Sequence, residues 1–261
     1  MDLSVLQYEV VDAVAVIRMS HPPVNAFGPA FLEDLETVLE RLNKPGEARA
    51  ALITSAIPFL FSAGDDVSQL REIDDHLLEL HPRAVAALDA FEALPMPTVA
   101  VINGHALGGG FELALTCDFR FMAAGPGLVG LPEVRLGMIP AFGGTQRLTQ
   151  LVGKAKALEL MFKGLQLTAE DAVQAGLITE VIPAEDLYDH SFGYAARLAR
   201  QATGAIASIK SAVNVGLREG FARGMEEEAR VFRQNIRSHD AQEGIAAFLD
   251  GRKPSFKGPR P

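Results

Sequence analysis

Residues 98–117 read Thr-Val-Ala-Val-Ile-Asn-Gly-His-Ala-Leu-Gly-Gly-Gly-Phe-Glu-Leu-Ala-Leu-Thr-Cys. The apolar run 98–102 predicts a buried strand, and Asn103-Gly104 is typical of a turn. We expect a helix from Gly109 or Gly110 to about Cys117. Because three consecutive glycines separate strand from helix, the backbone there can approach a ligand without side-chain hindrance.

The glycine triplet has more than one explanation. Free N–H groups and the positive dipole end at a helix start could stabilise an oxyanion. A flexible turn, or a tight contact between strand and helix, would use the same glycines. A dinucleotide-binding loop requires Gly-x-Gly-x-x-Gly, and Leu113 stands where the last glycine would be, so that class of site is excluded.

Outward from this stretch, strand and helix signals alternate to about residue 183, which predicts an α/β fold. Thr145 is a candidate helix N-cap, and Thr168 with Asp171 has capping-box spacing. Pro82 is expected to break or begin a helix. Beyond Glu185 only helical signals remain. Strands are expected over 10–19, 50–54, 119–123 and 178–182, and helices over 29–42 and 73–94. We therefore divide the chain into a core with the active site, 1–195, and a helical region, 196–261.

Composition narrows the class of protein. The 261 residues are 48% hydrophobic with a net charge of -9, which disfavours nucleic acid as a partner. The single Cys117 suits a reducing compartment and reads as a buried structural thiol. The histidines show no metal-ligand spacing, so we expect no metal. No apolar run approaches membrane-spanning length and no signal peptide is evident at Met-Asp-Leu-Ser, so we expect a cytoplasmic protein without a membrane partner.

Two glutamates are candidates for acid–base chemistry. Glu112 lies in an otherwise apolar helix, and Glu133 follows Leu131-Pro132. Apolar surroundings desolvate a carboxylate and raise its pKa, and two such groups could hold a water between them. Each glutamate alone also fits a surface position, and spacing does not show that the two meet. The turn at 61–66 could supply a second backbone N–H, although by itself it is an ordinary turn.

Taken together, these segments resemble the enoyl-CoA hydratase/isomerase (crotonase) family. The likeness rests on residues 103–118, on Gly130-Leu131-Pro132-Glu133, on Gly143-Gly144-Thr145-Gln146-Arg147-Leu148, on Phe61-Ser62-Ala63-Gly64 and on Ala175-Gly176-Leu177. It covers nearly the whole chain, in order. The fold implied is a spiral of ββα turns with a C-terminal helical region used in trimerisation. Homotrimers or dimers of trimers are expected.

The resemblance also implies an active site and a reaction. The N–H groups of Asp65 and Gly109 would bind the thioester oxygen of an acyl-CoA, with Glu112 and Glu133 flanking the catalytic water. By analogy Glu112 would act mainly as the base, and Glu133 would exchange a proton with the α-carbon. No cofactor is expected, because coenzyme A is part of the substrate. Further substrate contacts are expected at Ala63, Gly64, Asp66, Leu107, Gly108, Pro132, Gly143 and Phe248.

The chain departs from the family pattern at Asp65 and at Ala141-Phe142, which replaces a common Gly-Ala before Gly143-Gly144 and is expected to narrow the pocket wall. Asp65 stands where the family usually has alanine, and a carboxylate beside an enolate would repel it unless it is paired or turned away. Both glutamates favour enoyl-CoA hydratase, because isomerases of this family commonly lose the counterpart of Glu112. An enoyl-CoA isomerase, or another acyl-CoA lyase of this family, is the alternative. A non-enzymatic binding protein is disfavoured by the intact acid–base pair.

Overall fold

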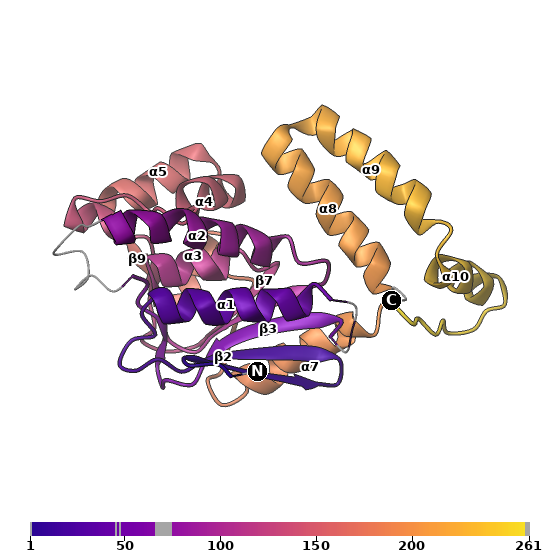
Figure 1. The fold of residues 1–261 in the computed structure, drawn as a ribbon, viewed down its shortest axis with the longest axis horizontal. Helices are drawn as coiled ribbons and strands as arrows, with labels where there is room; N and C mark the ends of the chain where they lie inside the picture. The colour runs from indigo at the N-terminus through magenta and orange to yellow at the C-terminus, as the bar shows by residue number, and fades with distance from the viewer. Residues whose placement is uncertain (1, 45, 47, 66–74, 259–261) are drawn as a thin grey trace.

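The computed structural model describes residues 2–44, 46, 48–65 and 75–258 of the chain. Two β-sheets form the centre of the molecule, and most helices pack around them (Figure 1). The last three helices extend away from the sheets as an arm. The N-terminal end of the chain lies beside the first strands (Figure 1).

Six strands make up the larger sheet among the described residues, in the order β1-β2-β3-β5-β7-β10. The first pair, β1 (Leu6–Val11) and β2 (Val14–Met19), is an antiparallel hairpin, and all later neighbours are parallel. Asp12 and Ala13 join the hairpin with positive φ, as a tight two-residue turn requires. The other strands are β3 (Ala50–Ser55), β5 (Thr98–Ile102), β7 (Phe119–Ala123) and β10 (Glu180–Ile182).

The smaller sheet holds four short strands in the described part of the chain. They are β4 (Leu60–Ser62), β6 (His105–Leu107), β8 (Val129–Gly130) and β9 (Gln166–Leu167), paired in that order. The first three are mutually parallel, and β9 runs antiparallel to β8. Two or three residues per strand carry too little periodic signal for sequence analysis, which predicted none of these four strands.

Successive segments repeat one turn of ββα, each adding a strand to both sheets. The turns are β3-β4-α2, β5-β6-α3, and β7-β8 followed by η2 and α4. Their helical elements are α2 (Asp75–Glu92), α3 (Gly109–Leu115), the 3-10 helix η2 (Glu133–Leu136) and α4 (Gly144–Val152). Because the turns stack in parallel, the start of α3 and the start of η2 follow neighbouring strands of the smaller sheet, β6 and β8. This arrangement positions the residues of the candidate site.

Both faces of the larger sheet are covered, which explains why its strands are almost wholly apolar. Ala51 and Ile53 of β3 belong to a cluster with α1 (Pro29–Leu42), α2 and α3. Ala50 and Leu52 of the same strand pack toward α7 (Leu187–Ala199) on the opposite face. Two further helices, α5 (Lys154–Lys163) and α6 (Ala169–Gln174), complete the core.

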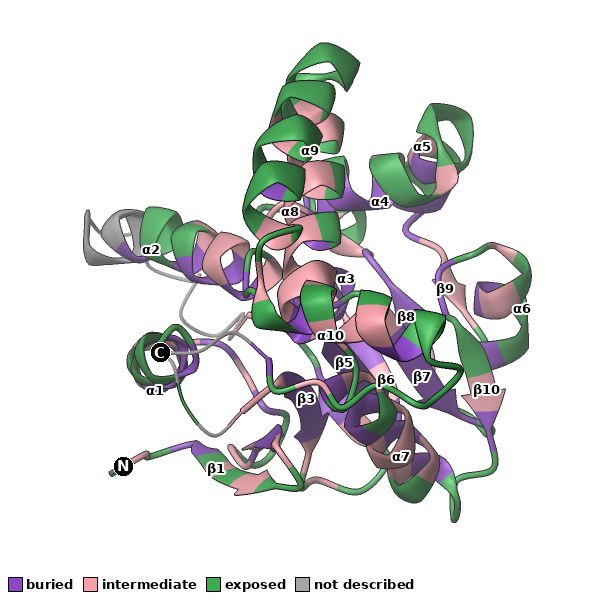
Figure 2. Ribbon diagram, turned by 90° about the vertical axis from the view of Figure 1, so that its right-hand side faces the viewer, coloured by how far each residue is buried: buried purple, intermediate pink, exposed green. Residues whose placement is uncertain are grey.

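The arm consists of α8 (Thr203–Glu219), α9 (Phe221–Asn235) and α10 (His239–Leu249). Helices α8 and α9 form a hairpin (Figure 1) at Gly220, whose φ is +95°. Lys210 of α8 is buried and ties the hairpin to the core, because its Nζ donates to Asp118 Oδ2 at 2.9 Å. Much of α9 and α10 is exposed (Figure 2). The predicted division of the chain near residue 195 stays a prediction.

Two local expectations were wrong, and one was confirmed. Helix α2 continues through Pro82, because its apolar face, with Leu80, Ala84 and Leu88 buried, outweighs one lost backbone hydrogen bond. Thr145 is not an N-cap, since α4 begins one residue earlier. Thr168 does cap α6, accepting from the amide of Asp171 at 3.2 Å. No helix within the described ranges has the length and apolar character to cross a membrane.

Candidate active site

The glycine triplet joins β6 to α3 at the centre of the molecule. Gly108 has φ +52° and ψ -131°, a conformation that favours glycine, and α3 begins at Gly109. A Cβ at Gly110 would lie 2.4 Å from the carbonyl oxygen of Ser62, so close packing on β4 requires glycine there. A Cβ at Gly109 would come within 3.1 Å of the Phe142 ring. The triplet is therefore a tight strand–helix contact whose first helical amide faces the site.

The turn after β4 lies directly against the start of α3. Gly64 has φ +85°, and a Cβ there would be 2.6 Å from the backbone nitrogen of Gly109. Asn25, which sequence analysis missed, fixes this turn. Its side-chain Nδ2 donates to Phe61 O at 2.8 Å, and its backbone carbonyl accepts from Ser62 Oγ at 2.9 Å. Among the described residues, neither the Asp65 amide nor the Gly109 amide donates a backbone hydrogen bond. Two amides free to bind one oxygen thus lie on adjoining segments.

Glu112 projects from the first turn of α3 into the core, where the residue is only 1% exposed. Its Oε1 accepts hydrogen bonds from the amides of Phe142 at 2.8 Å and Gly144 at 2.6 Å. A Cβ at Gly144 would come within 2.7 Å of that oxygen, so glycine is needed for the carboxylate to reach the start of α4. The amides of Phe142 and Gly144 therefore hold this carboxyl group in place.

Burial dominates the electrostatics of Glu112. Desolvation, helped by the nearby charges of Glu133 and Asp65, raises its pKa to about 7 against the lowering effect of the two amide hydrogen bonds. A carboxyl group with that pKa exchanges a proton near neutral pH, which suits a general base or acid.

Glu133 is the first residue of η2 and faces the glycine triplet. Its Oε1 lies 3.0 Å from the position that a Cβ would take at Gly108. Its Oε2 is buried, and no described residue makes a hydrogen bond to it. Burial raises the pKa of Glu133, and the charge of Asp65 adds to the effect. The charge of Glu133 in turn raises the pKa of Glu112, so the two predicted carboxyl groups lie close together at one site.

Asp65 supplies a third carboxyl group, which the sequence singled out as unusual. It interacts electrostatically with both glutamates, and burial raises its pKa to about 6, with His81 acting in the opposite direction. Close carboxyl groups in a desolvated site do not all ionise together, so the cluster retains protons at pH values where isolated carboxylates are fully charged.

Other predicted contacts divide into three groups. Ala63 lies in the turn after β4, and Leu107 is the last residue of β6, before the glycine triplet. Pro132 directly precedes Glu133, and Gly143 directly precedes Gly144, whose amide binds Glu112. Asp66 lies outside the described residues. Phe248 lies on α10 and is 86% exposed, at the outer end of the arm and away from α3 (Figure 1). Within this chain Phe248 is not part of the site.

Sequence analysis missed the aromatic wall of the site. Phe27 stacks on Phe31 with ring centroids 4.1 Å apart, and Phe142 lies 6.3 Å from Phe27. His81 is 6.0 Å from the Phe142 ring, and its Nε2 is 2.9 Å from Ala141 O. These residues come from three separate stretches of the chain, 27–31, 81 and 141–142, without a shared motif. Only the Ala141-Phe142 departure before the Gly143-Gly144 motif could have drawn attention to any of them.

We expect Asp65→Asn to move the acid limb of the pH–rate profile to lower pH. The acid limb reports the loss of the ionised base as Glu112 takes up a proton, and removing the Asp65 charge lowers the pKa of Glu112. The comparison is kcat/KM across pH for Asp65→Asn and for Asp189→Asn, an exposed aspartate on α7. A limb that stays at its original pH in Asp65→Asn would show that the two carboxyl groups do not interact.

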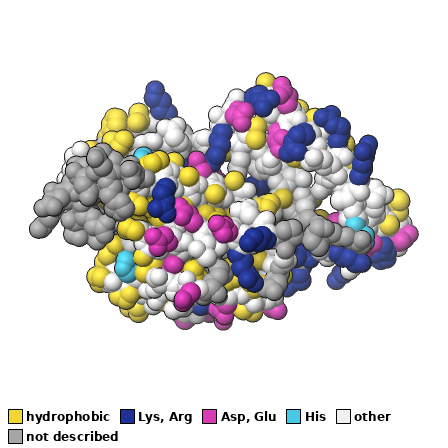
Figure 3. All heavy atoms as spheres, viewed as in Figure 1, with side chains coloured by type: hydrophobic (Ala, Val, Ile, Leu, Met, Phe, Trp, Pro, Cys, Tyr) yellow, Lys and Arg dark blue, Asp and Glu magenta, His cyan; other side chains and the backbone are white. Residues whose placement is uncertain are grey.

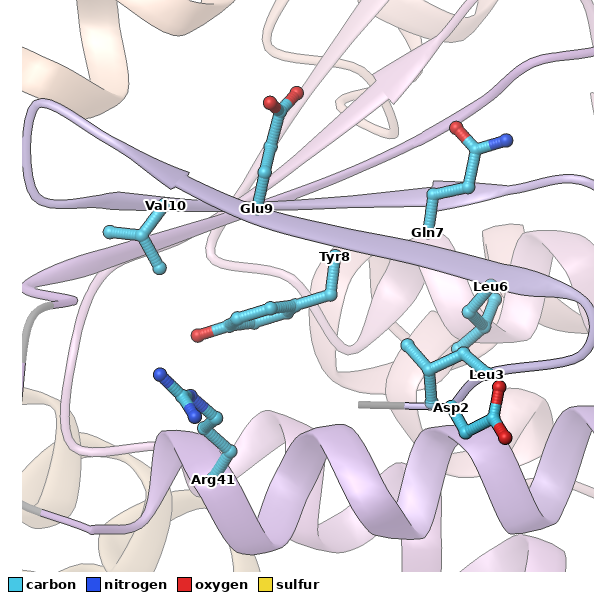
Figure 4. A pocket seen from close by; sticks show the side chains of 8 residues that line it. All are labelled: Asp2, Leu3, Leu6, Gln7, Tyr8, Glu9, Val10 and Arg41. Atoms are coloured by element: carbon cyan, nitrogen blue, oxygen red, sulfur yellow. The ribbon is translucent and has the colours of Figure 1, made fainter.

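Two hollows lie elsewhere on the described surface. One is bordered by β1 and the end of α1, with the Tyr8 and Arg41 side chains facing each other across it (Figure 4). The other lies between α10 and the C-terminal segment and includes Phe248 and Phe256. Neither contains the candidate catalytic residues. Within the described ranges, no cluster of three or more His, Cys, Asp or Glu side chains is arranged to hold a metal ion.

Comparison with known protein families identifies the family of this chain. The family model for enoyl-CoA hydratase/isomerase matches residues 9–259. The chain belongs to the enoyl-CoA hydratase/isomerase family. A Bacillus subtilis member of this family, named "Probable enoyl-CoA hydratase", is 37% identical over 251 residues, covering 94% of this chain and 95% of the relative. A mouse mitochondrial member, enoyl-CoA hydratase domain-containing protein 2, is 35% identical over 94% of this chain and 84% of its own length.

Solved structures of family members confirm the predicted crotonase fold. An enoyl-CoA hydratase from Geobacillus kaustophilus superimposes with a TM-score of 0.95 at 32% identity, covering 99% of this chain and 98% of the other. One from Bacillus anthracis gives a TM-score of 0.92 at 31% identity, covering 98% and 100%. The spiral of ββα turns and the helical C-terminal region are therefore those of this enzyme family.

Proposed function

We propose that this protein is an enoyl-CoA hydratase, which adds water reversibly across the 2,3 double bond of a 2-enoyl-CoA to give a 3-hydroxyacyl-CoA. The observation that carries the proposal is the meeting of Glu112 and Glu133 beside the free amides of Asp65 and Gly109. Family membership supports an acyl-CoA thioester as substrate. Coenzyme A arrives as part of that substrate, so the reaction uses no further cofactor.

In the proposed mechanism the thioester oxygen accepts hydrogen bonds from the Asp65 and Gly109 amides. These bonds strengthen as negative charge develops on the oxygen in the enolate-like transition state. Ionised Glu112 takes a proton from water, whose oxygen attacks C3. Protonated Glu133 delivers a proton to C2. After the addition Glu112 is protonated and Glu133 is ionised. Proton exchange with solvent then returns both carboxyl groups to their starting states.

The hydrogen bonds of Glu112 suit the role of base. Its Oε1 is occupied by two backbone amides, which fix the carboxylate and leave Oε2 for water. Oε2 of Glu133 has no described partner and is free to exchange a proton with the substrate. The two carboxyl groups thus differ in how firmly they are held, which supports different roles for them.

The direct test is the ultraviolet absorbance of the conjugated enoyl thioester. With crotonyl-CoA as substrate, a hydratase removes this absorbance. An enoyl-CoA isomerase, the alternative, leaves crotonyl-CoA unchanged and generates the absorbance from a 3-enoyl-CoA. Loss with crotonyl-CoA would support hydration, whereas a gain with the 3-enoyl-CoA alone would replace the proposal by isomerisation.

We also propose that the arm mediates assembly into a homotrimer or a dimer of trimers. Large apolar side chains are exposed along it, among them Phe221 at 83% and Phe248 at 86%. Charged side chains of both signs share the arm surface (Figure 3). Exposed apolar area of this kind is typical of a protein interface. The predicted role of Phe248 in substrate binding also requires assembly, because Phe248 could then contact only the substrate bound to a neighbouring copy of the chain.

We expect light scattering to give a mass three or six times the 28.0 kDa of one chain. Phe232→Asp, on the exposed face of α9, should lower that mass by placing a charge in the interface. Phe59→Asp, at an equally exposed aromatic on the core, serves as the control. A wild-type protein that is monomeric at micromolar concentration would rule out the assembly.

A further inference from the structure

Arg147 binds the 142–144 loop, whose amides bind Glu112. The amide of Phe142 donates to Glu112 Oε1, and the carbonyl of the same residue accepts from Arg147 Nη1 at 2.7 Å. A Cβ at Gly143 would fall 2.2 Å from Nη1, so the guanidinium packs directly against the loop backbone. Arg147 and the Glu112 carboxylate are thus linked through the backbone of a single residue, Phe142.

Arg147 is a buried cation with a specific set of partners. Its side chain is 7% exposed. The second guanidinium nitrogen, Nη2, binds the carboxylates of Asp89 and Glu92 on α2, the latter at 3.2 Å. Its Nε is buried without a described acceptor. Burying an arginine is costly unless it is paired, so these two carboxylates fix where the guanidinium lies.

The same two carboxylates bind a residue of the arm. Arg218, near the end of α8, contacts Asp89 Oδ1 at 3.3 Å and also pairs with Glu92. The neighbouring Leu217 carbonyl accepts from Gln150 of α4 at 3.4 Å. Arg147, Asp89, Glu92 and Arg218, here called the α2–α4–α8 ion cluster, balance two positive charges against two negative ones. They join two core helices to the arm close to the catalytic loop.

We propose that Arg147 is a positioning residue for Glu112, acting through the backbone of Phe142, and that Arg218 makes helix α8 of the arm part of this support. The proposal rests on the proposed function, in which Glu112 is the base. It assigns a catalytic consequence to a contact between the arm and the core within one chain.

The direction of the effect follows from the hydrogen bonds. Without Arg147, the Phe142 carbonyl loses its donor and the 142–144 loop can move away from Glu112. Weaker amide bonds to the carboxylate raise the pKa of Glu112, because those bonds favour its ionised form. The charged groups that face Glu112 are Glu133 on η2 and Asp65 after β4, and both already raise its pKa. The acid limb of the pH–rate profile therefore moves to higher pH.

Arg147→Lys tests the proposal while keeping a buried positive charge. A lysine cannot reach the Phe142 carbonyl and both carboxylates as the planar guanidinium does. We expect kcat for crotonyl-CoA to fall about 10–100-fold, as for a misplaced catalytic group, with KM changed little. The acid limb should shift upward. A folded Arg147→Lys enzyme with wild-type kcat and an unmoved limb would overturn the proposal.

A second variant tests the arm without touching the core. Arg218→Gln removes the exposed half of the ion cluster, and Arg223→Gln removes an arginine of α9 that pairs with Glu219 and Glu226, outside the cluster. We expect a several-fold fall in kcat and an upward shift of the acid limb for Arg218→Gln alone. Equal behaviour of the two variants would contradict the role of α8.

A readout independent of turnover separates this proposal from the proposed function. The difference in Tm between the Glu112→Gln variant and its parent, followed across pH, reports the pKa of Glu112. Measured in the wild-type and Arg147→Lys backgrounds, that pKa should be higher in the second. If crotonyl-CoA is not a substrate but the pKa moves, the positioning role stands and the hydratase assignment fails. If crotonyl-CoA is hydrated and the pKa does not move, the positioning role fails alone.

Discussion

Glu112→Gln is expected to lower kcat for crotonyl-CoA by about 10²–10⁴-fold, the contribution typical of a general base. The side chain of glutamine is nearly the same size and keeps an oxygen that can accept from the Phe142 and Gly144 amides. The substitution therefore removes the proton acceptor and leaves the loop in place. KM should change little, because the thioester is bound elsewhere, at the paired amides. The measurement is initial rates across substrate concentration.

The same variant should be more stable than the wild type above neutral pH. Burial raises the folded-state pKa of Glu112 from 4.5 to about 7, so the ionised carboxylate destabilises the fold by roughly 3 kcal/mol. The native state binds the extra proton between those values, so wild-type stability falls as pH rises from about 4.5 to 7. Glu112→Gln does not lose stability in this pH range. Its Tm should exceed that of the wild type by several degrees at pH 8, and the two Tm values should become equal at low pH.

Glu159→Gln is the matched control for both effects. Glu159 lies on the surface of α5 and pairs with Lys156 and Lys163 of the same helix. Its replacement should leave kcat unchanged, and also the pH dependence of Tm above about pH 4.5, where Glu159 is ionised in both the folded and the unfolded state. A Glu112→Gln enzyme as active as the Glu159→Gln control would remove Glu112 from the mechanism.

The oxyanion site predicts a second large effect, a loss of about 10²–10³-fold in kcat for Gly109→Pro relative to Gly109→Ala. Proline suits the first position of a helix, so α3 can still begin there, but its nitrogen carries no hydrogen. Alanine keeps the N–H and adds the Cβ that would press on the Phe142 ring at 3.1 Å. The ratio of the two variants therefore isolates the N–H from the steric effect.

Circular dichroism and Tm establish that both Gly109 variants are folded before their rates are compared. If Gly109→Pro and Gly109→Ala are equally impaired, the loss is steric and the amide of Gly109 does not bind the thioester oxygen. A Gly109→Pro enzyme with wild-type turnover would contradict the assignment more strongly.

The long, periodic elements could be predicted from the sequence. The strand at 98–102, the helix at 29–42 and the alternation up to residue 183 all follow from hydrophobic spacing, and the structure places them close to the expected bounds. Family motifs supplied the spiral order. The four strands of the smaller sheet could not be predicted, because two or three residues carry almost no periodic signal and are stabilised by their neighbours in space.

Candidate residues were found where motif and chemistry coincided. Glu112 and Glu133 stood out as carboxylates in apolar surroundings, yet their meeting at one site depends on parallel stacking of β6 and β8. The buried thiol of Cys117 was expected from its apolar helix, and burial raises its pKa to about 12. Arg147 was quoted in a motif without a role, since only the fold shows that it contacts the Phe142 carbonyl and two carboxylates of a distant helix.

The central claim is that this site adds water to a 2-enoyl thioester. The most direct measurement is mass spectrometry of the product formed from crotonyl-CoA in water enriched in heavy oxygen. We expect a 3-hydroxyacyl-CoA that has gained one water and carries one heavy oxygen on the acyl group, formed about 10²–10⁴-fold more slowly by Glu112→Gln than by the wild type. A product of unchanged mass, or a heavy oxygen incorporated equally with the variant, would contradict hydration by this pair of glutamates.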